Sequence, residues 1–404
     1  MSTIFKLPRL TNVHKVALIT FFSSLYLYGH VGTLYLQARS LNLLQASSIW
    51  SVIVLTIFVA EVPTGIVADK IGRKKSIIMA LFLQVAGELF YLFASSYLAF
   101  VAIAILAGVG FAFSSGCVEA LVYDSLPENA REERMKQAMG LNGAAYYLAF
   151  FFAPILGTLL VPRFTLDRFL AAVFLTACSV FMALLVAFTL EETNGEREVG
   201  ETAVTILKNG FDCIRGNRFL LWLVGVSVFT ATFAGTLSSL YQPYFAAFDL
   251  TARAMGIASA VGALLAVGLQ KNIFRFEQLV GKRAAFTVSV LLPGFGYLLL
   301  ALAASPAVAF AAFLLTYGTA TMKGPLLSSY QNGAIPKKIR ATVLSFINMV
   351  VSLYAAVIGL LMGWLADWHV SLPFWLAAML ILLFAAVWRV DKVMLKQNTQ
   401  FSGG

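Results

Sequence analysis

The chain has 404 residues, of which 60% are hydrophobic and only 12% charged, with a mean hydropathy of +0.85 and a formal net charge of +10. Soluble domains average about 25% charged residues, so the composition excludes a soluble protein. It predicts a polytopic membrane protein.

Twelve apolar runs follow one another along the chain, each long enough to cross a hydrocarbon core of about 30 Å as a helix. They lie at 14–37, 46–68, 75–96, 97–124, 136–161, 167–190, 219–246, 253–273, 283–304, 305–331, 341–366 and 369–391. The runs lack the period-two alternation of a membrane barrel. We therefore expect an all-α polytopic membrane protein with 12 transmembrane helices, the first of them retained rather than removed as a signal.

The basic residues are distributed unevenly between the two membrane sides that twelve spans define. One side receives 24 of the 29 Lys and Arg, whereas the other receives Arg39, Arg163, Arg168 and Arg253. The positive-inside rule then predicts that both termini are cytoplasmic, in a bacterial-type inner (plasma) membrane. The basic excess is thus a topology signal, and we expect no nucleic acid partner.

The loop between the second and third runs carries small and charged residues at a fixed spacing. These residues are Glu61, Gly65, Asp69, Gly72, Arg73 and Lys74. Gly65, with Pro63, allows a neighbouring backbone to approach closely. Asp69 lies where a helix stops, so it can accept hydrogen bonds from the N-terminus of a neighbouring helix or pair with Arg73. Gly72 then turns the chain.

This spacing resembles the loop between helices 2 and 3 of the major facilitator superfamily. The resemblance implies a secondary transporter with two pseudo-symmetric six-helix bundles that works by alternating access. In family members with this loop, an acid at the cytoplasmic end of helix 4 joins the aspartate and the arginine, and Asp124 has that position. We expect Asp69, Arg73 and Asp124 to form a gating cluster, supported by Glu61, that favours the outward-open state. Alternatively, Asp124 only caps its helix.

A polar segment divides the chain into a six-span bundle (1–190), a cytoplasmic linker (191–218) and a second bundle (219–404). In the linker Val204, Leu207, Phe211 and Ile214 recur at helical spacing, which predicts an amphipathic helix on the membrane surface. It either joins the bundles or binds a regulatory partner.

The second half repeats the first. QLVGKR at 278–283 has the spacing of DKIGRK, and Gly281 follows Gly72 at an offset of 209 residues (281 − 72). Transporters use such repeats to enclose a substrate between two halves near the membrane midplane. In helix 5, APILG at 153–157 resembles the glycine–proline motif of exporters, although small residues there also permit close helix crossing.

Four ionisable residues lie inside predicted spans, where charges usually face a cavity or a partner. They are His30, Glu88, Glu119 and Lys323. We expect Glu88 or Glu119 to carry a coupling proton. Lys323 follows Glu119 by 204 residues (323 − 119), close to the repeat offset, so the two are expected at similar depth, in contact or bridged by substrate.

Several polar and aromatic positions are candidates for the substrate site. With His30 and Lys323 they are Asn142, Tyr146, Tyr241, Gln242, Tyr317 and Asn348. If they face one cavity, they suit a partly apolar organic molecule better than a bare ion.

The function predicted first is proton-coupled export of small amphipathic organic compounds. The alternatives are proton-linked transport of an organic anion such as a carboxylate or siderophore, which Lys323 favours, and a membrane receptor or scaffold without transport. The sequence has no Gly-rich Lys-Ser/Thr nucleotide loop, and histidines at 14, 30 and 369 form no cluster. We therefore expect no enzyme, cofactor or metal site, and a monomer in the bilayer with a small-molecule substrate and a proton as partners.

Overall fold

The computed structural model describes residues 11–193, 203–231, 233–336 and 339–389. Within these ranges the chain is helical and contains no strand. Seven of the basic residues counted for topology lie outside the described residues: Lys6, Arg9, Arg197, Lys337, Lys338, Lys392 and Lys396.

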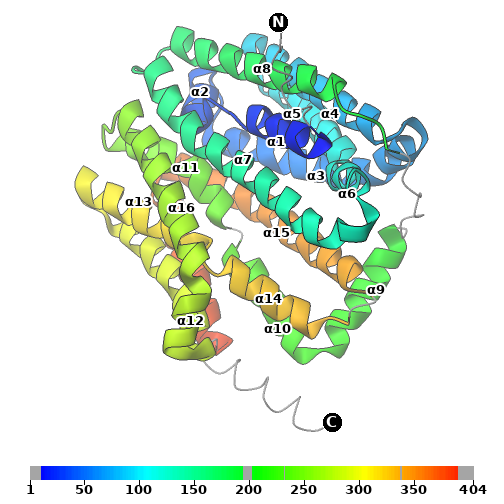
Figure 1. Ribbon diagram of the computed structural model, residues 1–404. Helices are drawn as coiled ribbons and strands as arrows, with labels where there is room; N and C mark the ends of the chain where they lie inside the picture. Colours follow the sequence, from blue (N-terminus) through cyan, green and yellow to red (C-terminus); the bar gives the residue numbers. More distant parts are fainter. Residues whose placement is uncertain (1–10, 194–202, 232, 337–338, 390–404) are drawn as a thin grey trace, which may run out of the picture.

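The first six expected spans form the first half of the molecule, ten short and long helices that are coloured blue to green in Figure 1. They are α1 (Asn12–Ser23), η1 (Gly29–Val31), α2 (Gly32–Ala38), α3 (Leu43–Ile71), α4 (Arg73–Phe93), α5 (Tyr97–Ser114), α6 (Cys117–Asp124), η2 (Glu128–Ala130), α7 (Arg131–Leu160) and α8 (Leu166–Phe188).

The linker contains α9 (Ala203–Gly216), and the other six spans form the second half. Its elements are α10 (Arg218–Val226), the π-helical turn η3 (Ser227–Ala231), α11 (Phe233–Ala247), α12 (Ala252–Leu302), α13 (Pro306–Ala320), α14 (Gly324–Ala334), α15 (Arg340–Trp368) and α16 (Leu372–Val387). The long α12 holds two spans joined at Gly281, whose φ is 83°. The twelve-helix prediction is confirmed.

Every third span is interrupted, which the sequence did not predict. The first breaks between α1 and η1, the fourth at Ser115 and Gly116, the seventh at the π-helical turn, and the tenth between α13 and α14. Gly116 has φ 72°, a conformation that favours glycine. Irregular backbone at membrane depth is stable only where protein or a cavity surrounds it, so these four spans mark the interior of the molecule.

The two halves repeat each other in backbone conformation. Gly72 and Gly281 both have positive φ, of 95° and 83°. Ser40 and Asp249 are also left-handed, and they are separated by the same 209 residues (249 − 40). The offset read from one loop thus holds through the fold.

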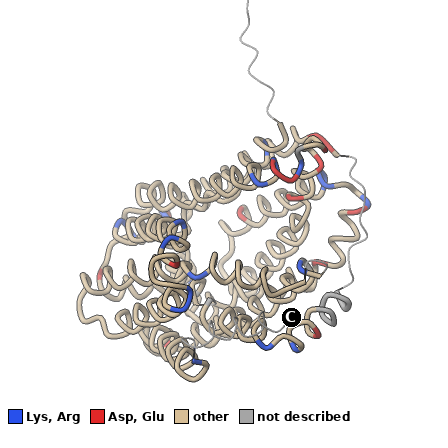
Figure 2. The backbone as a smooth tube through the Cα atoms, turned by 60° about the horizontal axis from the view of Figure 1, so that its bottom comes forward, with Lys and Arg blue, Asp and Glu red and all other residues tan. Residues whose placement is uncertain are grey.

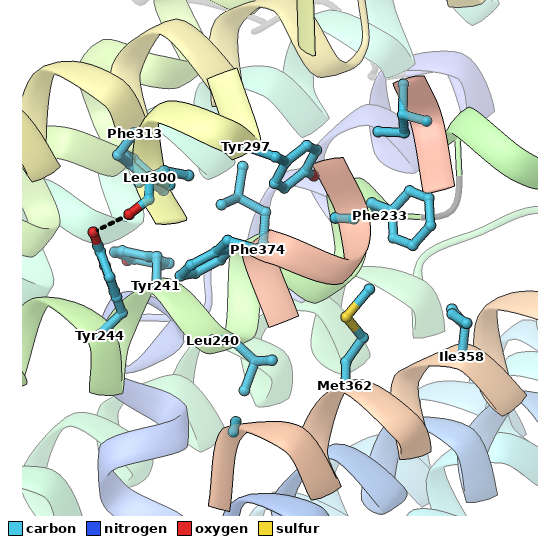
Figure 3. Close-up of a cluster of buried hydrophobic side chains, with 14 of the residues drawn as sticks. Phe233, Leu240, Tyr241, Tyr244, Tyr297, Leu300, Phe313, Ile358, Met362 and Phe374 are labelled. Atoms are coloured by element: carbon cyan, nitrogen blue, oxygen red, sulfur yellow. Dashed lines mark hydrogen bonds between the residues drawn. The ribbon is translucent and has the colours of Figure 1, made fainter. Parts of the chain in front are cut away.

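Buried side chains follow the same repeat. The hydroxyl of Tyr35 donates to the carbonyl of Tyr91 at 2.7 Å, and Tyr244 donates to the carbonyl of Leu300 at 2.5 Å. Both donor and acceptor shift by 209 residues (244 − 35 and 300 − 91). Figure 3 shows the Tyr244 bond beside Phe313 and other aromatic residues of the second-half core.

The halves meet where the first and seventh spans cross. The backbone N–H of Thr33 donates to Oε1 of Gln242 at 2.7 Å, and Nε2 of Gln242 donates to the carbonyl of Gly29 at 3.0 Å. Thr33 and Gln242 are equivalent positions of the repeat (242 − 33 = 209). The pseudo-two-fold axis therefore passes through this crossing.

Two further crossings, α3 with α15 and α7 with α12, flank the axis. A Cβ added to Gly363 would lie 2.8 Å from the Leu43 carbonyl, and one added to Gly256 would lie 2.8 Å from the Pro154 carbonyl. These glycines let the helices approach closely, as small residues do in membrane bundles.

We call the membrane side that carries the Gly72 and Gly281 loops the basic side. The crossings described above lie toward the opposite side. On the basic side, the recess beside Gly72 is lined by residues of the first half and the start of the linker. Figure 1 shows the halves diverging toward α6 and α14, and Figure 2 shows the charged residues concentrated near helix ends and loops. The contacts between the halves described above lie on the opposite side, and the helices diverge toward the basic side. We call this arrangement closed on the opposite side and open on the basic side.

The linker helix α9 packs against α15. Ile214 is 6% exposed and belongs to a cluster with Val343 and Ile347, whereas Phe211 is 54% exposed. The side chains of Val204 and Leu207 lie outside the described residues. The predicted helix is present, and its described apolar contacts are with α15, α10 and Ile335. The proposed domain boundaries stay predictions.

Candidate functional site

The Gly72 loop holds an ion pair between Arg73 and Asp124. Nη1 of Arg73 also donates to the carbonyl of Ala120 at 2.9 Å. The side chains of Arg73 and Asp124 are 25% and 13% exposed, so water reaches the pair only partly. The contact joins the start of α4 to the end of α6, both in the first half.

Glu192, at the start of the linker, caps α4. Its Oε1 accepts the backbone N–H groups of Arg73 at 3.0 Å and Lys74 at 3.2 Å. The preceding Glu191 pairs with Lys15 at 3.3 Å. A carboxylate at a helix N-terminus is stabilised by the exposed N–H groups and the helix dipole. The sequence analysis missed this role, although two acids directly after the sixth span were a signal for it.

The other loop residues are less engaged. Among the described residues, Asp69 makes no ion pair or hydrogen bond, and it is exposed on the rim of the recess. Ser115 Oγ lies 3.5 Å from a carboxylate oxygen of Glu61. No heavy atom lies within 4 Å of a Cβ added to Gly65. The expectation of a close backbone approach at Gly65 is therefore wrong in this conformation.

A cavity of about 680 Å³ enters the first half between the interrupted first and fourth spans. Its lining is mainly apolar and aromatic, with a small polar group on one wall. The lining includes Thr20, Tyr26, Tyr28, Trp50, Gln84, Glu88, Tyr91, Phe100, Phe111, Asn142, Tyr146 and Phe150.

Glu88 on α4 is the buried acid of this cavity, 7% exposed. The hydroxyl of Tyr28 lies 3.2 and 3.1 Å from its two oxygens. Tyr28 belongs to the break after α1, and this irregular backbone brings its ring toward α4.

Amide side chains supply the other polar contacts of the wall. Nε2 of Gln84 donates to the hydroxyl of Tyr26 at 2.8 Å, and Thr20 donates to Oδ1 of Asn142 at 2.5 Å. Tyr146 is 44% exposed beside them. The structure thus brings Glu88, Asn142 and Tyr146 together, and it adds Tyr26, Tyr28 and Gln84, which were not among the predicted site residues.

Three substrate candidates lie instead in the closed contact between the halves. Gln242 bonds across the axis, as described above. Tyr241 donates to the carbonyl of His30 at 3.1 Å and lies 2.6 Å from Oγ of Ser259. The ring of His30 packs against Gly157. These residues seal the opposite side in this conformation.

Lys323 and Glu119 do not contact each other in this structure, which is open on the basic side, so their predicted pairing stays a prediction. The ammonium of Lys323 is enclosed, and it donates to the carbonyls of Thr230 at 2.9 Å and Ala320 at 3.0 Å. Glu119 is exposed on α6, beyond the break at Gly116, and lines the recess of the basic side. The two residues therefore have different surroundings.

The last two substrate candidates make no described contact with the cavity. Tyr317 packs on Phe313, with ring centroids 5.3 Å apart, and Asn348 is exposed on α15.

The family model of the Major Facilitator Superfamily matches residues 16–353. An uncharacterized MFS-type transporter of Bacillus subtilis, YxaM, is 24% identical over 363 residues, which cover 88% of each chain. Another uncharacterized MFS-type transporter, from Methanocaldococcus jannaschii, is 21% identical over 70% of this chain and 72% of its own.

Solved transporters share the fold. The nucleoside transporter NupG superimposes with a TM-score of 0.73 at 13% identity, covering 95% of this chain and 99% of its own. The D-xylose-proton symporter superimposes with a TM-score of 0.70 at 14% identity, covering 93% and 95%. Such identities establish common architecture. With the family match, the twelve spans and the repeat, they show that the chain belongs to the major facilitator superfamily and is a multi-pass membrane transporter.

Proposed function

We propose that this transporter exports a small amphipathic organic compound by alternating access and that protons drive the export. The observation that carries the proposal is the cavity of the first half. Its apolar and aromatic walls bear one cluster of polar groups around Glu88. A partly apolar molecule can bury its hydrocarbon part against such walls while the polar groups orient it.

Glu88 is the proposed proton carrier. A carboxylate accepts hydrogen bonds, whereas a protonated carboxyl also donates one, and the hydroxyl of Tyr28 can serve as donor or acceptor. Tyr28, at 3.1 and 3.2 Å, can therefore satisfy both forms of Glu88. Glu119 is exposed to the basic side and has no comparable site, so we do not propose it as the carrier.

We assign the basic side to the cytoplasm and the protein to a bacterial-type inner membrane, because of the excess of Lys and Arg. The structure is then open to the cytoplasm, as an exporter must be when it takes up its substrate. The alternative of an organic anion depended on Lys323, whose ammonium two backbone carbonyls already bind. We therefore do not propose that alternative.

Proteoliposomes that hold the protein in one known orientation test the proposal. A panel of amphipathic compounds is screened by counterflow, and accumulation of each active compound is then measured with and without an imposed pH gradient. In Glu88→Gln we expect gradient-driven accumulation to fall at least tenfold while exchange of substrate continues, because exchange needs no net proton transfer.

The matched control is Glu277→Gln. Glu277 also accepts a tyrosine hydroxyl, from Tyr330 at 2.5 Å, but it lies outside the cavity. Gradient-driven accumulation of substrate by Glu277→Gln should equal that by the wild type. Full gradient-driven accumulation in Glu88→Gln would refute the role of Glu88, and a panel without any counterflow substrate would refute the substrate class.

A further inference from the structure

The last turn of α15 places a carboxylate on the first turn of α3, across the contact between the two halves. Oδ1 of Asp367 accepts the backbone N–H of Leu43 at 2.6 Å, and Oδ2 accepts that of Leu44 at 3.0 Å. Both donors belong to the first turn of α3. The contact lies at the opposite side, which is closed.

The N-terminus of α3 is otherwise capped within its own chain segment. Oδ1 of Asn42 accepts the N–H of Gln45 at 2.8 Å, and Oε1 of Gln45 accepts the N–H of Asn42 at 3.1 Å, which completes a capping box. This box leaves the N–H groups of Leu43 and Leu44 without an acceptor from the first half. Asp367 supplies both acceptors, and its charge complements the positive end of the helix.

The repeat offers no second charged contact of this kind. The position equivalent to Asp367 is Thr158 (367 − 209), and its hydroxyl donates to Ile155 of the same helix. The other hydrogen bonds described above between the halves join neutral groups. Asp367 thus supplies a charged contact that the pseudo-symmetry alone does not explain. Because Asp367 is exposed, water can replace α3 when the helices separate.

We propose that Asp367 is a positioning residue of the transport cycle, which holds the opposite side closed by binding the N-terminus of α3. In the state open to that side the ends of α3 and α15 separate and the carboxylate is hydrated. α3 and α15 are antiparallel, and α3 carries Asp69 near its own end on the basic side. Asp69 is unengaged among the described residues of this structure, which is open there, whereas Asp367 is engaged where the structure is closed. The inference goes beyond the proposed function, since it depends on neither substrate nor protons.

Distances between spin labels on a cysteine-free background test the inference without any substrate. Labels at Ser95 and Ala304, equivalent exposed positions (304 − 95 = 209), report the opposite side. Labels at Lys70 and Leu279, which are also equivalent and exposed (279 − 70 = 209), report the basic side.

In Asp367→Asn we expect the population with the short distance at the opposite side to fall at least threefold. The distance at the basic side should shorten in the same molecules. Asp367→Ala, which removes both acceptors, should have the larger effect. A merely structural role would lower the melting temperature without this reciprocal change.

Asp249→Asn is the matched control. Asp249 is another exposed acid at the opposite side, and it makes no hydrogen bond or ion pair with the first half among the described residues. Its variant should keep the wild-type distances. Unchanged distances in both Asp367 variants would overturn the inference, and so would an equal shift in Asp249→Asn, because that would be a general effect of surface charge.

Discussion

At the scale of single residues, the Gly72 loop contains two differently engaged charged groups. Arg73 is in an ion pair, whereas Asp69 has no described partner. The ion pair of Arg73 with Asp124 is formed although the basic side is open. It therefore cannot by itself hold that side closed. Asp69, three residues before the turn at Gly72, has no described partner in this state. The predicted cluster thus divides into a pair that fixes α6 against α4 and an acid available for another contact.

This division predicts different results for two similar substitutions. Asp124→Asn should lower the melting temperature in detergent as well as transport, because a hydrogen-bonded charge pair contributes about 1–3 kcal/mol. Asp69→Asn should reduce transport severely with little change in melting temperature. Thermal unfolding and counterflow on the same preparations provide the measurements. Equal melting shifts in the two variants would contradict the division.

At the scale of helices, close approach depends on a few glycines at the crossings. Gly256 of α12 faces the side chain of Thr158 and the carbonyl of Pro154 on α7. Backbone cannot move aside as a flexible side chain can. Even one methyl group therefore has to separate the helices where the opposite side closes.

Gly256→Ala should consequently reduce transport at least tenfold at equal abundance in the membrane. Gly268→Ala on the same helix is the control, since no heavy atom lies within 4 Å of a Cβ added there. Alanine is the better helix former, so the control should retain transport and stability. Transport rates in vesicles compare the two, and similar rates would show that α7 and α12 do not need this contact.

At the scale of the whole molecule, the repeat predicts equal energetic roles for equivalent residues. Tyr35 and Tyr244 each hold a carbonyl near the end of a helix in their own half, those of Tyr91 and Leu300. Loss of either hydroxyl removes one hydrogen bond to a carbonyl, which contributes about 0.5–1.5 kcal/mol.

Tyr35→Phe and Tyr244→Phe should therefore lower the melting temperature by similar amounts, and their effects should add in the double variant because the sites share no partner. Thermal unfolding of the three variants measures this. If one substitution is neutral and the other severe, the halves are not energetically equivalent at this position.

The sequence predicted the spans and the repeat because hydrophobic length and loop spacing are local properties. It did not predict the interrupted spans, and these determine the site. The break after α1 brings Tyr28 to Glu88, and Glu119 lies exposed beyond the break at Gly116. Because 204 differs from 209 by five residues, Glu119 and Lys323 are not equivalent positions of the repeat. Contacts such as that of Glu192 with Arg73, 119 residues apart, depend on packing that no local pattern contains.

The cap that Glu192 places on α4 also sets a mechanical limit. The linker is held at the first half through Glu192, and it docks on the second half again through α9, which begins at Ala203. Eleven Cα steps separate these points (203 − 192), and each extended step spans at most about 3.6 Å. While both attachments last, the two anchor points cannot be more than about 40 Å apart.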